Sequence, residues 1–182
     1  MKVARGLASI AYEIIGFEYH REITMTFTIR SSAFDHHANI PKKYTCEGED
    51  LSPHLEWFAL PEGSKSLVLI VDDPDAPDPK APKMTYVHWL LYNIPTTSNG
   101  LMEAVASQDL PLGTKEGKND WNKTGYGGPC PPIGEHRYFF KLYALDSVLP
   151  DLNYPNKAAL EKAMMGKIMA EAQLMGTYKK VK

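Results

Sequence analysis

The sequence predicts a β-rich domain of strands and long loops rather than a helical bundle. Fourteen prolines are many for 182 residues, and most of them lie outside any helical pattern. Four segments have the composition of strands, whereas one segment has the apolar spacing of a helix. The length fits a single domain that can bury a sizeable core.

The four expected strands differ in their predicted burial. Residues 25–30 alternate apolar and polar side chains, which is the period-two pattern of a half-buried strand. Residues 66–71, SLVLIV, form a short apolar run typical of a strand buried on both faces. Residues 85–94 and 137–145 are rich in aromatic and β-branched side chains, which favour strands.

Three segments are expected to be irregular. Residues 31–53 are rich in His, Asn, Gly, Asp and Pro, as loops are. After residue 71 the chain becomes acidic, and four prolines between residues 74 and 82 are expected to forbid both helix and central strand, so this segment is a surface loop or a strand terminus. Residues 96–128 have weak periodicity and predict a long connection that is functional or contains short strands.

One helix is predicted near the C-terminus, over residues 157–178. Asn156 is a suitable N-cap for it. The apolar residues recur at spacings of three to four: Leu160, Met164, Ile168, Ala172 and Met175.

The first 24 residues are predicted to be an N-terminal extension outside the fold, with a single domain over residues 25–182. Tyr12 and Glu13 interrupt the apolar stretch, so it makes a poor signal peptide. The stretch is also too short and too polar to span a membrane.

Charge and cysteine usage narrow the classes of partner. The formal net charge is −2 and there is no long run of Lys or Arg, which argues against a nucleic-acid partner. Cys46 and Cys130 are far apart and match no zinc spacing, so neither a metal nor a cofactor is expected. We expect two reduced thiols in a cytoplasmic protein, with one disulfide as the alternative.

Three segments concentrate residues that could form a site. His136 and Tyr138 are two residues apart on an expected strand and share a face, and His88 is expected to share its face with Tyr86 and Leu90. The Gly- and Pro-rich residues 127–132 form a loop of fixed shape, in which the Gly128 N–H is a candidate anion donor.

Asp73 follows the buried strand and is expected to lie beside these histidines. A carboxylate there should raise the pKa of the histidines and keep them as hydrogen-bond donors. Each feature alone has a plainer interpretation: an Asp-Pro turn, a histidine buried in a strand, a rigid loop. Their occurrence together and in this order is more specific than any one of them.

In this order the segments resemble the phosphatidylethanolamine-binding protein family, also called the Raf kinase inhibitor protein family, in its bacterial and archaeal branch. The matching pieces are residues 46–53 with 55–57, 73–77, 88–89 with 93–95, 125–129, and 131–138, which reads PPIGEHRY. The likeness runs from about residue 25 to the C-terminus.

The resemblance implies an all-β-dominated fold, a β-sandwich of antiparallel sheets with a few short helices including one near the C-terminus. It also implies a pocket that binds small anions or a phospholipid headgroup. The implied ligand-binding residues are Asp73, His88, Gly128, Pro129, His136 and Tyr138. Cys130 stands between Pro129 and Pro131, where animal members run Gly-Pro-Pro, so the pocket rim differs.

The expected function is therefore binding of a small anionic, phosphate-like ligand, with a regulatory protein partner of the kinase- or protease-inhibitor type and a homodimer as further hypotheses. The alternative is a small hydrolase or lyase that uses His88, His136 and Asp73 as acid–base groups. The sequence offers it no obvious nucleophile, because there is no G-x-S-x-G elbow and two prolines flank Cys130. The near-neutral charge argues against stable membrane association.

Overall fold

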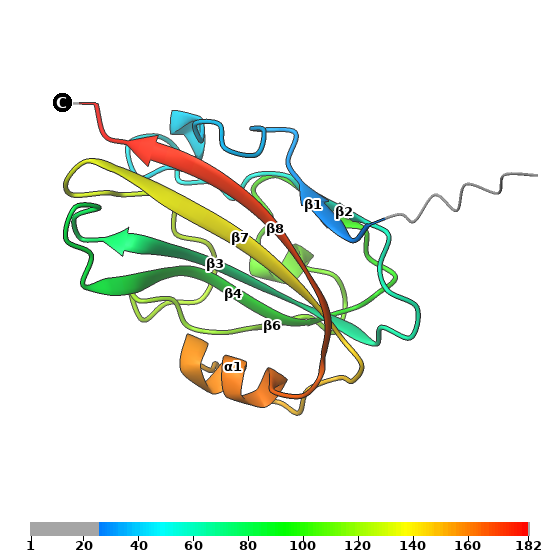
Figure 1. Cartoon of the computed structure of the whole chain (residues 1–182). Helices are drawn as coiled ribbons and strands as arrows, with labels where there is room; N and C mark the ends of the chain where they lie inside the picture. Colours follow the sequence, from blue (N-terminus) through cyan, green and yellow to red (C-terminus); the bar gives the residue numbers. More distant parts are fainter. Residues whose placement is uncertain (1–25, 182) are drawn as a thin grey trace, which may run out of the picture.

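The computed structural model describes residues 26–181, and these form two antiparallel sheets and one α-helix (Figure 1). The predicted extension over residues 1–24 lies outside the described residues. The three-stranded sheet has the order β1 (Thr28–Arg30), β2 (Leu55–Phe58) and β5 (Gly100–Leu101). The five-stranded sheet has the order β6 (Lys115–Glu116), β4 (Met84–Ile94), β3 (Ser66–Ala76), β7 (Glu135–Leu145) and β8 (Ile168–Lys179).

Two apolar clusters hold these layers together. The inner core lies between the sheets and contains Trp57 of β2 together with Leu69 and Phe140 of the large sheet. The outer core lies between the large sheet and helix α1 (Lys157–Met164), where Ile70 packs with Leu160. Figure 1 shows α1 on the face of the large sheet opposite β1 and β2. The two clusters explain why β3 is apolar on both faces, as the SLVLIV run predicted.

The C-terminal segment corrects the helix prediction. Helix α1 begins at the Asn156 cap, whose side chain accepts from Ala159 N–H, but it ends at Met164. Gly166 adopts a φ of 73°, which turns the chain away from the helix, and residues 168–179 then pair with β7. A spacing of four fits a strand as well as a helix, because four is also a multiple of two. The apolar positions beyond Met164 therefore did not distinguish the two structures.

Contrary to the prediction from the sequence, the prolines after residue 71 do not exclude a central strand. Strand β3 continues through Pro74 to Ala76, although it is a central strand. Its ladder with β7 ends at Asp72, and its register with β4 is irregular between Asp73 and Ala76. Pro74 therefore lies at an irregular stretch where its missing N–H breaks no regular ladder.

The long connections contain little regular structure, as expected. Residues 31–53 include the 3-10 turn Lys42–Tyr44, and residues 96–128 include β5, β6 and the 3-10 turn Ser107–Asp109. Parts of the two connections meet, because the Tyr126 hydroxyl donates to the Tyr44 carbonyl and the Cys46 N–H donates to the Pro129 carbonyl.

The two cysteines are not reduced thiols. Cys46 and Cys130 form a disulfide between loops that are 84 residues apart in the chain, so the expectation of free thiols is wrong. Their Cα atoms lie 5.4 Å apart, which is within the range that a disulfide can join. Sequence spacing alone did not reveal this proximity.

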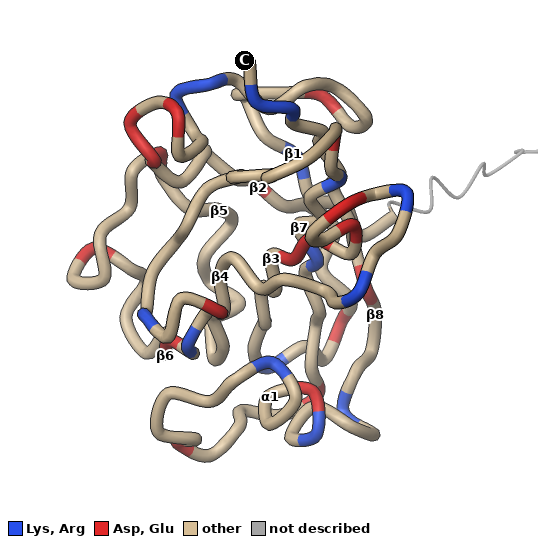
Figure 2. Tube along the Cα trace, turned by 90° about the vertical axis from the view of Figure 1, so that its left-hand side faces the viewer, with Lys and Arg blue, Asp and Glu red and all other residues tan. Residues whose placement is uncertain are grey.

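The described surface carries mixed charge. In Figure 2 the lysine and arginine residues are interspersed with aspartate and glutamate along the chain. None of the helices within residues 26–181 has the length and apolar character needed to cross a membrane.

Candidate functional site

A cavity of about 310 Å³ opens at the end of the large sheet where β3 ends and β4 begins. Residues from β3, β4 and the two connections β3–β4 and β6–β7 line it: Asp73, Ala76, Pro77, Met84, Tyr86, His88, Trp121, Cys130, Pro131 and Pro132. Most of this lining is apolar or aromatic, and its ionisable groups are the Asp73 carboxylate, the His88 imidazole and the Tyr86 phenol. Such a mixture is typical of pockets that bind small molecules.

Asp73 and His136 form a buried pair beside this cavity. Asp73 Oδ2 lies 2.7 Å from His136 Nδ1, and Asp73 Oδ1 accepts from the Asp75 N–H at 2.8 Å. The second ring nitrogen of His136 lies 2.9 Å from the Ile133 carbonyl oxygen. A carbonyl can only accept, so Nε2 must carry a hydrogen. The second proton of the pair therefore lies between Nδ1 and the carboxylate, and the pair as a whole is neutral.

His136 itself has no exposed surface and does not line the cavity. Since the protein occupies both of its nitrogens, its place in the site is to orient and neutralise Asp73. The prediction that the two residues lie together is confirmed, whereas direct contact of His136 with a ligand remains a prediction.

His88 supplies the imidazole that lines the cavity. Its Nδ1 lies 2.7 Å from the Gly127 carbonyl oxygen, so Nδ1 donates and Nε2 is left without a partner among the described residues. Burial lowers the pKa of His88, an effect larger than the opposing attraction of the Gly127 carbonyl and Asp73. Asp73 acts on His88 in the expected direction, but the net pKa of His88 is lowered because the loss of hydration outweighs the carboxylate.

A β-bulge sets the direction of His88. Trp89 is opposite Val71 and Val87 is opposite Asp72, so His88 is an extra residue in β4. Its ring packs against Tyr86 at a centroid distance of 5.6 Å, as expected. Leu90 instead belongs to the outer core on the opposite face. The expectation that His88 and Leu90 share a face is therefore wrong, because the bulge changes the alternation between them.

Tyr138 lies directly beneath the two histidines. Its ring stacks on His136 at 6.4 Å and meets His88 edge-on at 5.2 Å, which confirms that His136 and Tyr138 share a face. Its hydroxyl is buried with the Cys130 backbone as a close polar neighbour, but it has no partner with good hydrogen-bond geometry within residues 26–181. Burial, reinforced by the charge of Asp73, raises the pKa of Tyr138 well above the ordinary range, so the hydroxyl stays protonated.

Gly128 and Pro129 hold the loop rather than face the cavity. The Gly128 N–H donates to Asp50 Oδ1 at 2.7 Å, and the Pro129 carbonyl accepts from Cys46 N–H at 3.2 Å. A Cβ on Gly128 would lie 2.4 Å from the Tyr44 carbonyl oxygen, so a larger residue does not fit there. The Gly128 N–H already has an acceptor within the protein.

Trp121 is a residue of the cavity that the sequence did not identify. The Trp121 ring meets Tyr86 at 4.8 Å and His88 at 5.1 Å, and the residue remains 40% exposed. Gly127 lies under this ring, since a Cβ there would be 2.6 Å from it. An exposed tryptophan in a long irregular connection is a signal that could have identified this residue.

An ion pair supports the carboxylate side of the site. Arg137 donates to both oxygens of Asp75, at 2.7 and 2.9 Å. The Arg137 guanidinium holds the pKa of Asp75 below its usual range. Because the Asp75 N–H donates to Asp73, this pair fixes the backbone that orients the cavity carboxylate.

Within residues 26–181 no group of three metal-ligating side chains comes together. The family model described as phosphatidylethanolamine-binding protein matches residues 30–179. This chain belongs to the phosphatidylethanolamine-binding protein family.

Relatives within this family are found in archaea and bacteria. A UPF0098 protein of Methanothermobacter thermautotrophicus is 46% identical over 153 residues, covering 84% of this chain and 98% of the relative. A UPF0098 protein of Aquifex aeolicus is 42% identical over 172 residues, covering 92% and 96%. The predicted resemblance to the bacterial and archaeal branch is confirmed.

Solved structures of the phosphatidylethanolamine-binding protein family share the fold. A homologue from Chlamydia trachomatis is 41% identical with a TM-score of 0.78, covering 85% of this chain and 98% of its own. E. coli YbcL, a member of the mammalian family, is 30% identical with a TM-score of 0.76, covering 85% and 99%. A carboxypeptidase Y inhibitor in complex with its proteinase is 16% identical with a TM-score of 0.52, covering 85% of this chain and 83% of its own, and so shows the fold alone.

Proposed function

We propose that this protein is a binding module for a small ligand that carries an oxyanion, such as a phosphomonoester or the phosphoryl group of a phospholipid headgroup. The observation that carries the proposal is His88, which lines the cavity with its Nε2 free while Gly127 holds Nδ1. A proton on Nε2 would make His88 a charged donor at the floor of a mainly apolar cavity. Charge-assisted hydrogen bonds of this kind are the strong ones.

The buried carboxylate does not oppose an anion in this arrangement. His136 offsets the charge of Asp73. The Asp73 carboxylate still favours the protonated form of His88, although burial opposes it. Trp121, Tyr86 and the prolines at 131 and 132 supply apolar surface beside these groups. A low local dielectric strengthens the interaction between an imidazolium and an oxyanion.

The family description supports a headgroup ligand, since phosphatidylethanolamine carries both a phosphoryl and an ammonium group. The aromatic faces of Trp121 and Tyr86 suit the ammonium end, because cations are attracted to such rings. The enzyme alternative has less support. His136 has both nitrogens occupied, and Cys130 is in a disulfide rather than available as a nucleophile.

An NMR titration of the full chain with inorganic phosphate and with phosphoethanolamine tests the proposal. We expect saturable shifts of the His88 ring signals, with the His54 ring as an internal reference because it bonds Ser32 outside the cavity. His88→Asn keeps a donor for Gly127 but loses the second nitrogen, and we expect binding weaker by about 1.5–3 kcal/mol. If His88 signals do not move with either ligand, the proposal is wrong.

The affinity for sulfate should depend on pH through His88. Sulfate remains a dianion over the range in question, so the titrating partner is the protein. Since burial lowers the pKa of free His88 and a bound dianion favours its protonated form, affinity should rise as pH falls from 8 to 5. Isothermal titration calorimetry in buffers of different ionisation enthalpy should show proton uptake. A flat profile, equal to that of His88→Asn, would contradict this role.

The remaining expectations from the resemblance are separate proposals. Analytical ultracentrifugation of the full chain would decide the homodimer, and a monomer at all concentrations would remove it. The regulatory protein partner and the cytoplasmic location remain predictions.

A further inference from the structure

The Cys46–Cys130 disulfide lies on the wall of the candidate site. Cys130 lines that cavity and also a second cavity of about 310 Å³, which Cys46, Asp50 and Gly128 help to line. Trp121 lines both cavities as well. The disulfide and the tryptophan therefore form the partition between two neighbouring spaces.

The wall next to the disulfide has few other attachments. Within the part of the chain that the structure describes, residues 130–132 make no backbone hydrogen bond with other backbone groups, and two of the three are prolines that lack an N–H. The nearest anchors are the Pro129 carbonyl, which accepts from the Cys46 N–H at 3.2 Å, and the Ile133 carbonyl on His136. Between those anchors, the covalent bond to Cys46 is the strongest restraint on residues 130–132.

The disulfide can be reached from solvent. Cys46 is an exposed residue, while Cys130 is partly buried beside the cavity. Exposed disulfides exchange more readily with external thiols than buried ones.

We propose that this disulfide is a redox latch, a bond that holds the wall of the candidate ligand site in place. When a dithiol reductant breaks the bond, the affinity of the site for its ligand falls. The inference rests on the proposed function, because it concerns regulation of the same site. In the step, the Cys46–Cys130 bond breaks and each sulfur gains one hydrogen, while the dithiol loses two hydrogens and closes its own disulfide. Two electrons and two protons pass from the reductant to the protein.

Reduction displaces the wall for a steric reason. Two thiols need a separation of about 3.5 Å or more, whereas bonded sulfurs lie about 2 Å apart. On one side Gly128 already packs against the backbone of residues 44 and 45, so that part of the loop cannot move inward. We therefore expect Cys130 and the two prolines after it to move outward, which separates them from Asp73 and His88 and lets water into the cavity.

The test compares three states of the full chain: oxidised, reduced with dithiothreitol, and the double variant Cys46→Ser/Cys130→Ser. Phosphate affinity is measured by NMR at a temperature where circular dichroism shows all three to be folded. We expect at least a tenfold weaker affinity for the reduced protein and the double variant, full recovery on re-oxidation, and no response of the double variant to dithiothreitol. Equal affinity in the oxidised and reduced states would overturn the latch.

A second readout separates the latch from the proposed function. Amide hydrogen exchange at Ile133 and Gly134 reports the wall without any ligand, and reduction should accelerate it at least tenfold. If oxidised protein binds no phosphate but exchange still responds to reduction, the latch stands and the anion proposal fails. If exchange at these amides is unchanged on reduction, the latch is wrong whatever the ligand.

Discussion

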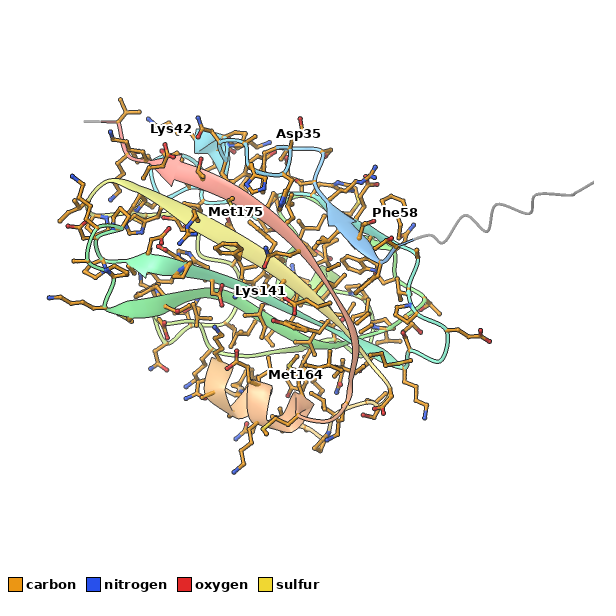
Figure 3. The ribbon with its side chains drawn as sticks, viewed as in Figure 1. Asp35, Lys42, Phe58, Lys141, Met164 and Met175 are labelled. Atoms are coloured by element: carbon orange, nitrogen blue, oxygen red, sulfur yellow. A yellow bond between two sulfur atoms is a disulfide. The ribbon has the colours of Figure 1, made fainter. Side chains whose placement is uncertain are left out.

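Asp72→Ala is expected to lower the free energy of unfolding by about 3–5 kcal/mol, because it leaves the partly buried Lys141 without its counter-ion and Lys157 with only Glu161 at 3.6 Å. Asp72 is fully buried on the outer face of β3, with Lys141 Nζ at 2.9 Å and Lys157 Nζ at 2.6 Å. Figure 3 shows Lys141 midway along β7, and Lys157 belongs to α1. Burial alone would lower the pKa of Lys157, but its hydrogen bond and attraction to Asp72 raise it.

Chemical denaturation followed by circular dichroism measures this loss. Asp151→Ala is the matched control, since the Lys115–Asp151 pair at 3.1 Å is solvent-exposed and should contribute at most about 1 kcal/mol. Replacing all three members of the Asp72 cluster by apolar residues of similar volume should restore most of the stability. If Asp72→Ala costs no more than the control, the cluster does not tie α1 to the sheet.

The double variant Cys46→Ser/Cys130→Ser is expected to lose about 4 kcal/mol of unfolding free energy. The disulfide joins residues separated by 84 positions, and closing so long a loop restricts the unfolded chain strongly. Wild-type protein unfolded in dithiothreitol should show the same stability as the variant, because both lack the same cross-link. A reduced wild type as stable as the oxidised protein would show that the cross-link contributes nothing.

The fold was predictable from the sequence wherever one periodicity held along a segment. The run of residues 66–71 predicted a strand buried on both faces, and the aromatic segments predicted β4 and β7. The prediction failed where the spacing fits both a helix and a strand. Apolar residues four apart after Met164 were compatible with a helix, but the turn at Gly166 and the pairing with β7 place them in a strand. Tertiary pairing outweighed the local pattern there.

The sequence predicted which residues form the site better than it predicted their hydrogen bonds and contacts. The motifs brought together Asp73, His88, His136 and Tyr138, which lie in or directly beneath one cavity. Sequence could not show which nitrogens remain free, because that depends on carbonyl groups of Gly127 and Ile133 in the connecting loops. Nor could it show the disulfide, which depends on loop paths between residues 84 positions apart.

The extra residue at His88 divides β4 into two stretches with different structural constraints. Before the bulge, inward-pointing positions such as Tyr86 contact the cavity; after it, Leu90 and Tyr92 pack beneath α1. Substitutions on the two sides should therefore produce separable phenotypes, altered ligand selectivity on one and altered heat resistance on the other. Removing His88 would restore the regular alternation, because Val87 already faces the helix and Trp89 the inner core. The strand could therefore close over the bulge at the cost of the cavity imidazole alone.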